Sequence, residues 1–100
     1  MNRILFQINY DVYPEKRDEY VASIKELETY LKDNKNHNYL VVEDKTRKNN
    51  FTEIFIFNNE AEFEALEDET DDRVQSLTTK IMTDYAVDGK TKYSTFYELG

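Results

Sequence analysis

The side chains with the clearest capacity for chemistry are amides and tyrosines on segments that read as strands. They are Gln7, Asn9, Tyr39, Tyr93 and Tyr97. Side chains on one face converge when strands pair, so these groups can line a common surface. An amide offers donors and an acceptor, and a tyrosine adds a hydroxyl to a flat ring. We therefore predict a pocket for a planar organic ligand, with Glu43 and Glu53 as further polar groups on the strands.

The same residues allow a structural interpretation, which stays open at this stage. Interface centres favour Tyr and Phe and need their polar atoms paired, so these groups could instead bond across the two-fold axis of a homodimer. Asn9 separates the two alternatives, because alternation places it on the strand face opposite Ile8 and Tyr10. Ligand binding depends on Asn9 in the first alternative, and stability depends on it in the second.

Few residues in this chain could support metal binding, phosphate binding or nucleophilic catalysis. His37 is the only imidazole and lies in a polar turn, so we expect it to be solvated. A metal site needs several converging ligands, yet the chain has no Cys, and the acids between residues 60 and 72 lack the spacing and the Gly of a calcium loop. Gly89 and Gly100 are the only glycines, which excludes a glycine-rich phosphate loop and a nucleophile elbow. We predict neither a metal nor a cofactor.

Length and charge limit the possible partners. One hundred residues suit a single domain, 1–100. The net charge is −8, and residues 51–100 carry all of it, so a nucleic-acid partner is not expected. The absence of Cys fits a reducing cytoplasm, which we take as the predicted location. No 18-residue apolar run and no apolar leader is present, so neither a membrane segment nor a signal peptide is expected.

Hydrophobic periodicity predicts the elements that must position these groups. Residues 3–12 alternate with a period of two and read as a strand. Pro14 and the acids after it are typical of a helix start, and apolar residues at spacings of three and four predict a helix over about 15–33. Residues 39–45 and 51–57 read as two strands joined by a hairpin loop.

The second half of the chain predicts one long helical region and a last strand. An apolar stripe runs from about residue 60 to 85, but five acids among six residues should bend or break the helix near 68–72. Asn58 or Asn59 can cap its start. Residues 91–99 alternate again and read as the fourth strand.

The predicted fold is α+β, with the order strand, helix, strand, strand, helix, strand. This is the ferredoxin-like βαββαβ arrangement, a four-stranded antiparallel sheet with two helices on one face. The strand 51–57 is apolar on both faces, with Phe51, Phe55 and Phe57 on one side and Ile54 and Ile56 on the other. The helices can cover only one face, so we predict that a second copy of the chain covers the other.

Two stretches of this sequence also resemble a known family. The run from Tyr39 to Phe63 resembles the middle of the dimeric α+β barrel proteins, and more narrowly of the antibiotic biosynthesis monooxygenase group. The opening from Ile8 to Tyr20 is similar to the first strand and helix of that group, and Asn9 is similar to an Asn on its first strand. Members that oxidise polyketides or degrade haem usually carry a Trp at the position of about Phe57, and the haem-degrading members place a His on the second helix. This chain has neither, so the resemblance implies the fold but no haem cofactor.

Two functions follow from these observations. The first is a cofactor-independent monooxygenase-like enzyme for an aromatic or conjugated small molecule, with Asn and Tyr hydrogen bonds holding an enolate-like intermediate. The alternative is a non-catalytic homodimer that binds a ligand or another protein. The enzyme needs a closed cavity with at least two inward polar groups, whereas the alternative needs a filled interior.

Overall fold

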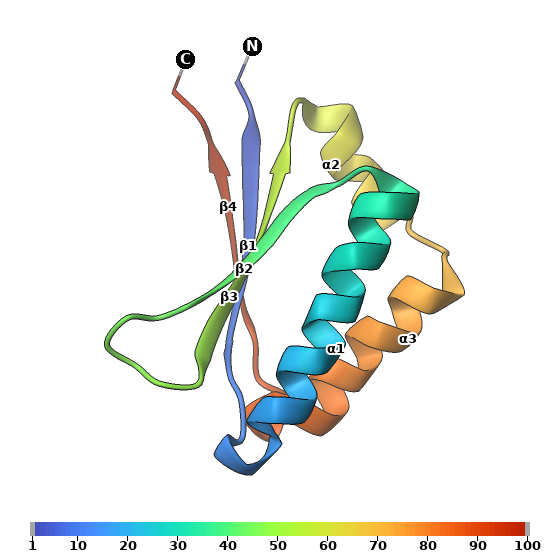
Figure 1. Ribbon diagram of the computed structural model, residues 1–100. Coiled ribbons are helices and arrows are strands. Elements are labelled where there is room, and N and C mark those ends of the chain that lie inside the picture. The colour runs from blue at the N-terminus through green and yellow to red at the C-terminus, as the bar shows by residue number, and fades with distance from the viewer. Residues whose placement is uncertain (1, 100) are drawn as a thin grey trace.

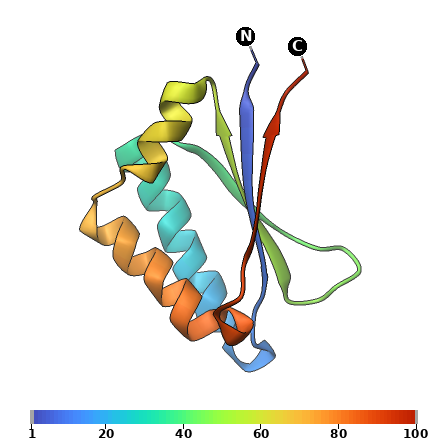
Figure 2. The same cartoon turned by 180° about the vertical axis from the view of Figure 1, so that it is seen from behind.

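A computed structural model describes residues 2–99 of the chain (Figure 1). The strands are β1 (Ile4–Asp11), β2 (Asn38–Glu43), β3 (Asn50–Phe57) and β4 (Lys92–Tyr97), in the order β2-β3-β1-β4 and antiparallel throughout. The main helices are α1 (Arg17–Tyr30), α2 (Glu60–Glu67) and α3 (Asp72–Lys80). The helices cover one face of the sheet and leave the other uncovered, as the two opposite views show (Figures 1 and 2). The predicted ferredoxin-like α+β fold is confirmed.

The first helix begins and ends close to its predicted limits. A 3₁₀ turn over Pro14–Lys16 leads into α1, and a wider turn over Leu31–Lys35 extends it. The left-handed backbone of Asn36, with φ of 53°, then turns the chain towards β2. The buried stripe of this helical segment packs on the sheet and consists of Tyr20, Ile24, Leu27 and Leu31.

The second helical region is divided where the acids gather, as predicted. The α2 helix ends at Glu67, and α3 begins at Asp72 after a short linker. The Asp71 carboxylate caps α3 by accepting hydrogen bonds from the backbone N–H groups of Arg73 and Val74. A second wide turn, Ile81–Tyr85, extends α3 towards β4.

Asn59 caps α2, and its loss should loosen that helix. Its side-chain oxygen accepts a hydrogen bond from the Glu62 N–H at 2.9 Å, while the Glu62 carboxylate accepts one from the Asn58 N–H at 3.0 Å. We expect Asn59→Ala to lower the free energy of unfolding by about 1 kcal/mol. Urea denaturation followed by circular dichroism measures the free energy of unfolding. Asn58→Ala is the matched control, because its backbone bond survives, and an equal loss in both variants would contradict the cap.

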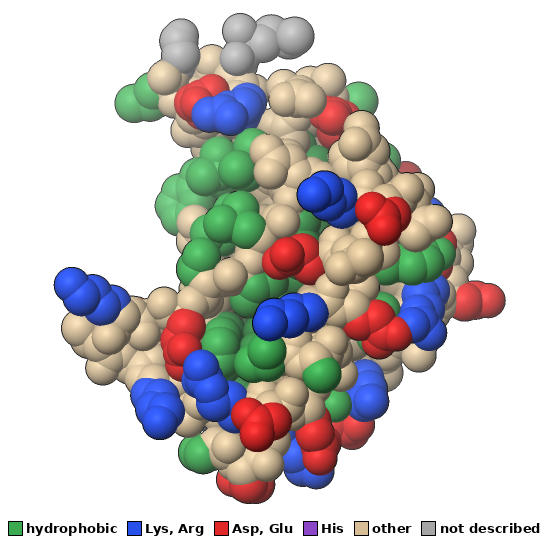
Figure 3. Space-filling model, in the orientation of Figure 1, with side chains coloured by type: hydrophobic (Ala, Val, Ile, Leu, Met, Phe, Trp, Pro, Cys, Tyr) green, Lys and Arg blue, Asp and Glu red, His purple; other side chains and the backbone are tan. Residues whose placement is uncertain are grey.

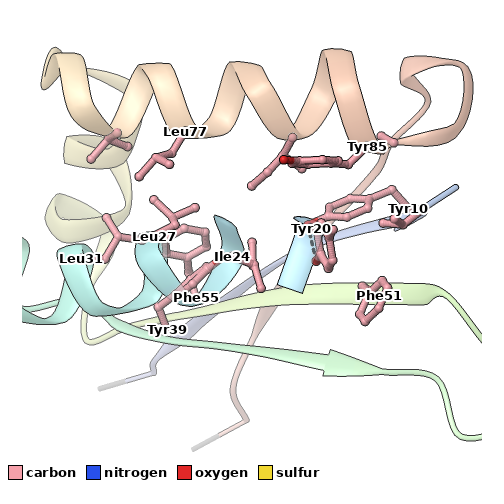
Figure 4. Close-up of a cluster of buried hydrophobic side chains, with 14 of the residues drawn as sticks. Tyr10, Tyr20, Ile24, Leu27, Leu31, Tyr39, Phe51, Phe55, Leu77 and Tyr85 are labelled. Atoms are coloured by element: carbon pink, nitrogen blue, oxygen red, sulfur yellow. Dashed lines mark hydrogen bonds between the residues drawn. The ribbon is translucent and has the colours of Figure 1, made fainter. Parts of the chain in front are cut away.

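The hydrophobic core lies between the helices and one face of the sheet. Figure 4 shows Ile24, Leu27 and Leu31 of the α1 segment and Leu77 of α3 directed towards the sheet residue Phe55. Directly paired residues of antiparallel strands share a face, so the pairing of Phe6 with Phe55 puts both on the helix side. The fully buried aromatic Tyr20 packs against Phe51 with 4.5 Å between ring centroids.

The opposite side of the sheet, here called the open face, is also apolar. Ile54 pairs with Gln7 on one neighbour and Leu40 on the other, which places all three on this face. Leu40, Val42 and Phe96 are each about 40–50% exposed. Figure 3 shows hydrophobic side chains gathered in the hollowed side of the molecule that faces away from the helices. The expectation that β3 is apolar on both faces is therefore confirmed.

Candidate functional site

A cavity of about 270 Å³ lies between the helix side of the sheet and the helices. Its lining residues are Phe6, Ile8, Tyr10, Leu27, Leu31, Glu53, Phe55, Leu66, Glu69, Val74, Gln75, Thr78, Ile81, Met82 and Tyr93. The deep end is formed by buried residues, among them Leu27, Phe55 and Ile81. The rim is formed by more exposed ones, among them Gln75 and Tyr93. The cavity is therefore an apolar slot that opens to solvent between α3 and β4.

Glu53 is the polar group at the deep end of this slot. Its residue is only 5% exposed although it carries a carboxyl group. The Tyr39 hydroxyl donates a hydrogen bond to Glu53 Oε1 at 2.6 Å, and the Tyr10 hydroxyl donates one to Oε2 at 2.7 Å. The Tyr20 hydroxyl lies 2.8 Å from that of Tyr10, and Figure 4 shows these two rings meeting beneath α3. Glu53 faces the helices because it lies two residues from both Phe51 and Phe55 on β3, and alternate residues of a strand share a face.

Burial controls the acidity of this cluster. It raises the pKa of the Glu53 carboxyl, while the hydrogen bonds from Tyr39 and Tyr10 act in the opposite direction. Burial beside Glu53 also raises the pKa of the hydroxyls of Tyr10 and Tyr39, so both stay protonated donors. A carboxylate that has lost its water is a stronger base than one in solution, so Glu53 can accept a proton from a bound molecule.

The rim joins the sheet edge to the break between α2 and α3. The rings of Phe6 and Tyr93 stack with centroids 5.9 Å apart, which carries the aromatic lining out to β4. Glu69 lies in the linker between the two helices and pairs with Lys35 at 3.0 Å. Lys35 also reaches Asp71 at 3.4 Å, so this ion-pair cluster ties the linker to the end of the α1 segment.

The structure divides the five predicted site residues between the two faces of the sheet. Tyr93 lines the cavity, whereas Tyr39 does not line it but donates a hydrogen bond to Glu53, which does. Tyr97 is 64% exposed and donates a hydrogen bond to Glu60 on α2. Gln7 and Asn9 belong to the open face and do not line this cavity. Of the two further polar groups, Glu53 lies in the cavity, and Glu43 instead binds Arg17 at 2.5 Å beside the hairpin.

Asn9 is bonded within the sheet. Its amide N–H₂ donates to the Asn50 side chain at 2.9 Å, to the Phe51 carbonyl at 3.2 Å and to the Thr52 hydroxyl at 3.0 Å. Asn50, in turn, is almost fully buried. These contacts tie β1 to β3 at the end of the sheet near the hairpin.

Asn9→Ala is therefore expected to cost stability rather than ligand binding. It leaves the Asn50 amide without one partner, and an unpaired buried polar group costs about 1–3 kcal/mol. Thermal melting measures the loss, and a ligand titration of the same variant should give unchanged affinity. An unchanged melting temperature with lost binding would place Asn9 in a site instead.

His37 is less solvated than its polar neighbours predict. Its ring packs edge-on to Phe55 and Phe57, each with 6.0 Å between centroids. Partial burial lowers the pKa of the imidazole. His37 follows the left-handed turn at Asn36, and its side chain lies against the sheet, which the sequence pattern did not indicate. Within residues 2–99 no group of three His, Cys, Asp or Glu side chains could hold a metal ion.

Comparison with known proteins identifies the fold. No protein-family model matches the chain, and no curated protein matches it. A conserved protein from Methanosarcina mazei superposes with a TM-score of 0.80 at 16% identity, covering 96% of this chain and 92% of the other. A candidate antibiotic biosynthesis monooxygenase from Caulobacter crescentus gives a TM-score of 0.82 at 13% identity, over 99% and 92% of the two chains. SnoaB, a cofactor-independent oxygenase from Streptomyces nogalater, gives 0.73 at 8% identity, over 94% and 90%.

These superpositions define the fold class of the chain. The chain has the ferredoxin-like α+β fold of the antibiotic biosynthesis monooxygenase-like proteins, and the predicted resemblance to that group is confirmed at the level of the fold. The helices of residues 2–99 lack the combination of length and apolar character that crossing a membrane requires.

Proposed function

We propose that this protein is a cofactor-independent monooxygenase-like enzyme that acts on an aromatic or conjugated small molecule in the cavity. The observation that carries the proposal is the buried Glu53 carboxyl, held by two tyrosine hydroxyls at the deep end of an apolar slot. An enzyme of this kind needs a cavity with at least two inward polar groups. Glu53 at the deep end and Glu69, Gln75 and Thr78 nearer the rim support that alternative over a filled interior.

The geometry supports a reaction that begins with proton transfer. Ionised Glu53 would take a proton from an acidic methylene group of the substrate, and the negative charge would move from the carboxylate to a delocalised carbanion. No new charge is created in the apolar cavity, which keeps this step inexpensive. The carbanion reduces O₂ and forms a C–O bond, and Glu53 returns the proton to give a hydroperoxide. Loss of water then leaves a carbonyl, so CH₂ and O₂ become C=O and H₂O without an external reductant.

The size and lining of the cavity favour small flat substrates. Pockets for drug-sized ligands span about 300–1,000 Å³, and this one lies just below that range. The rings of Phe6, Phe55 and Tyr93 lie on its sheet side. SnoaB, whose fold is similar, is a cofactor-independent oxygenase. This supports, for the present chain, a reaction that uses O₂ without a bound cofactor.

Oxygen uptake with anthrone, a flat ketone with an acidic methylene group, tests the proposal. We expect uptake above the rate in buffer alone, with one O₂ consumed for each carbonyl formed, and no change when a chelator is added. Tyr97→Phe should leave the rate unchanged, because this residue lies outside the cavity. Binding of anthrone without any acceleration would instead support the non-catalytic ligand-binding alternative.

We also propose that the protein forms a homodimer through its open face. Leu40, Val42 and Phe96 stand partly exposed there, and a second copy of the same sheet would remove them from water. The cytoplasmic location predicted from the cysteine-free sequence remains a proposal of the same kind.

A further inference from the structure

We propose that Tyr20 is a positioning residue of the candidate site, which donates its hydroxyl proton to Tyr10 and thereby fixes the hydrogen bond from Tyr10 to Glu53. Tyr20 does not line the cavity, so it acts on Glu53 through Tyr10. This inference rests on the proposed function, in which Glu53 is the reacting base. Its test reads the Glu53 carboxyl without any substrate, however, so the outcome does not depend on turnover.

The partners of the hydroxyl groups decide where their protons lie. An ionised carboxylate only accepts hydrogen bonds, and each tyrosine hydroxyl has one proton to donate. The Tyr10 hydroxyl lies 2.7 Å from Glu53 Oε2 and 2.8 Å from the Tyr20 hydroxyl. Because Tyr10 gives its single proton to Glu53, its oxygen has only lone pairs left for Tyr20. The bond between the two tyrosines therefore runs from Tyr20 to Tyr10.

The reverse direction would leave two buried groups without a partner. Tyr20 is 0% exposed, and within residues 2–99 its hydroxyl forms a hydrogen bond with that of Tyr10 alone. If Tyr10 donated to Tyr20 instead, the Tyr20 proton would have no acceptor and Glu53 Oε2 would lose its donor. Unpaired buried polar groups are costly, so this chain of donors has one direction while Glu53 is ionised.

A chain of donors with one direction strengthens its last bond. Accepting a proton from Tyr20 polarises the Tyr10 hydroxyl and makes it a better donor, and hydrogen bonds in series reinforce one another by roughly 10–30% where water is excluded. The contact also holds the Tyr10 hydroxyl in place, since the two rings meet edge-on with 5.8 Å between centroids. Tyr20 should therefore favour the ionised form of Glu53, which is the form that takes a proton.

Tyr85 offers a matched control for Tyr20. It is also buried, and its ring packs edge-on to that of Tyr20 with 6.1 Å between centroids. Its hydroxyl forms a hydrogen bond with that of Ser23 at 3.2 Å and not with Tyr10. Tyr85→Phe thus removes one buried hydroxyl from the same aromatic cluster but leaves the chain of donors to Glu53 intact.

The charged and titratable groups around this chain stay the same in both variants. They are Tyr93 and Glu69 in the cavity lining, Tyr39 on β2, Glu28 on α1, the pair of Arg17 and Glu43 beside Phe51, and Lys80, which lies over the Tyr85 ring. A difference between the two titrations therefore reports the loss of the Tyr20 hydroxyl and not a changed charge nearby.

Carbon-13 NMR of protein labelled at the glutamate carboxyl groups measures the titration, and the Glu53 signal is the one absent from Glu53→Gln. We expect Tyr20→Phe to move the midpoint to higher pH by about 0.3, and Tyr85→Phe to leave it unchanged. In the Tyr10→Phe background, Tyr20→Phe should have no further effect, because the link to Glu53 is already missing. The pH profile of oxygen uptake should move with the midpoint, while the KM for anthrone stays constant.

The sign of the shift decides the direction of the chain. A midpoint that moves to lower pH in Tyr20→Phe would show that Tyr20 competes for the Tyr10 proton. An unchanged midpoint, or one that Tyr85→Phe moves equally, would also overturn the proposal. A shift as expected in a protein that takes up no oxygen would retain this inference and lose the proposed function.

A second variant covers the case in which Tyr20→Phe does not fold. Replacement of Tyr20 by 3-fluorotyrosine keeps the hydroxyl and makes it a stronger donor. It should therefore move the Glu53 midpoint in the opposite direction, to lower pH. A midpoint that moves to higher pH with this residue would contradict donation from Tyr20 to Tyr10.

Discussion

Replacing Glu53 with Gln is expected to lower kcat for oxygen uptake by about 10²–10⁴-fold, which is the usual contribution of a positioned general base. Gln has nearly the same shape and can accept a hydrogen bond from Tyr39 or Tyr10, but its amide cannot take a proton from carbon. The loss should therefore fall on kcat, while the KM for anthrone changes little. The oxygen-uptake assay used for the wild type measures both parameters.

The pH dependence of the wild type gives an independent check on this role. Burial raises the pKa of Glu53 above the value of about 4.3 that a Glu has in an unfolded chain. The activity should accordingly fall as the pH drops through the raised pKa, because the base becomes protonated. Tyr39→Phe removes a hydrogen bond that favours the ionised form, so it should move the activity profile to higher pH.

Stability should change with pH in the opposite direction. The folded state binds the Glu53 proton more tightly than the unfolded state does. The stability associated with this proton is fully present below the unfolded pKa and is lost as the pH rises through the folded pKa. Glu53→Gln removes the titration, so urea denaturation across this pH window should show a flatter profile for the variant. If Glu53→Gln loses activity but its stability depends on pH in the same way as that of the wild type, Glu53 is not the titrating base.

The elements of this fold could be predicted from the sequence because local chemistry decides them. Alternation in residues 3–12 and 91–99 marks the first and last strands of the chain, and β1 and β4 lie within these limits. The acid-rich stretch at 68–72 marks the helix break, which the structure places between Glu67 and Asp72. These features depend on neighbours two to four residues apart, which a sequence displays directly.

The cavity could not be predicted in the same way because it depends on packing between distant segments. Alternation separates Asn9 from Ile8 and Tyr10, but it does not tell which face of the sheet holds a void. Glu53 alternates in phase with Phe51 and Phe55, and that position between two large apolar residues was the available signal for a buried acid. Its significance depends on the hydroxyls of Tyr10 and Tyr39, which come from two other strands.

Ile54→Glu is expected to convert the proposed homodimer into a monomer at micromolar concentration. Ile54 lies in the middle of the open face, opposite Gln7 on β1 and Leu40 on β2. In a two-fold interface the same patch meets itself, so the substitution would bury two carboxylates without partners. An uncompensated buried charge costs about 3–5 kcal/mol, which corresponds to a loss of affinity of more than about a hundredfold.

Sedimentation velocity distinguishes the outcomes through the mass of the particle. The wild type should sediment as a dimer and the variant as a single chain of 12.0 kDa. Thr79→Glu is the matched control, because it adds the same charge at an exposed position on α3 and should leave the dimer intact. A wild type that sediments as a monomer would contradict the interface. The apolar open face, on which Leu40, Val42 and Phe96 stand partly exposed, would then need another partner.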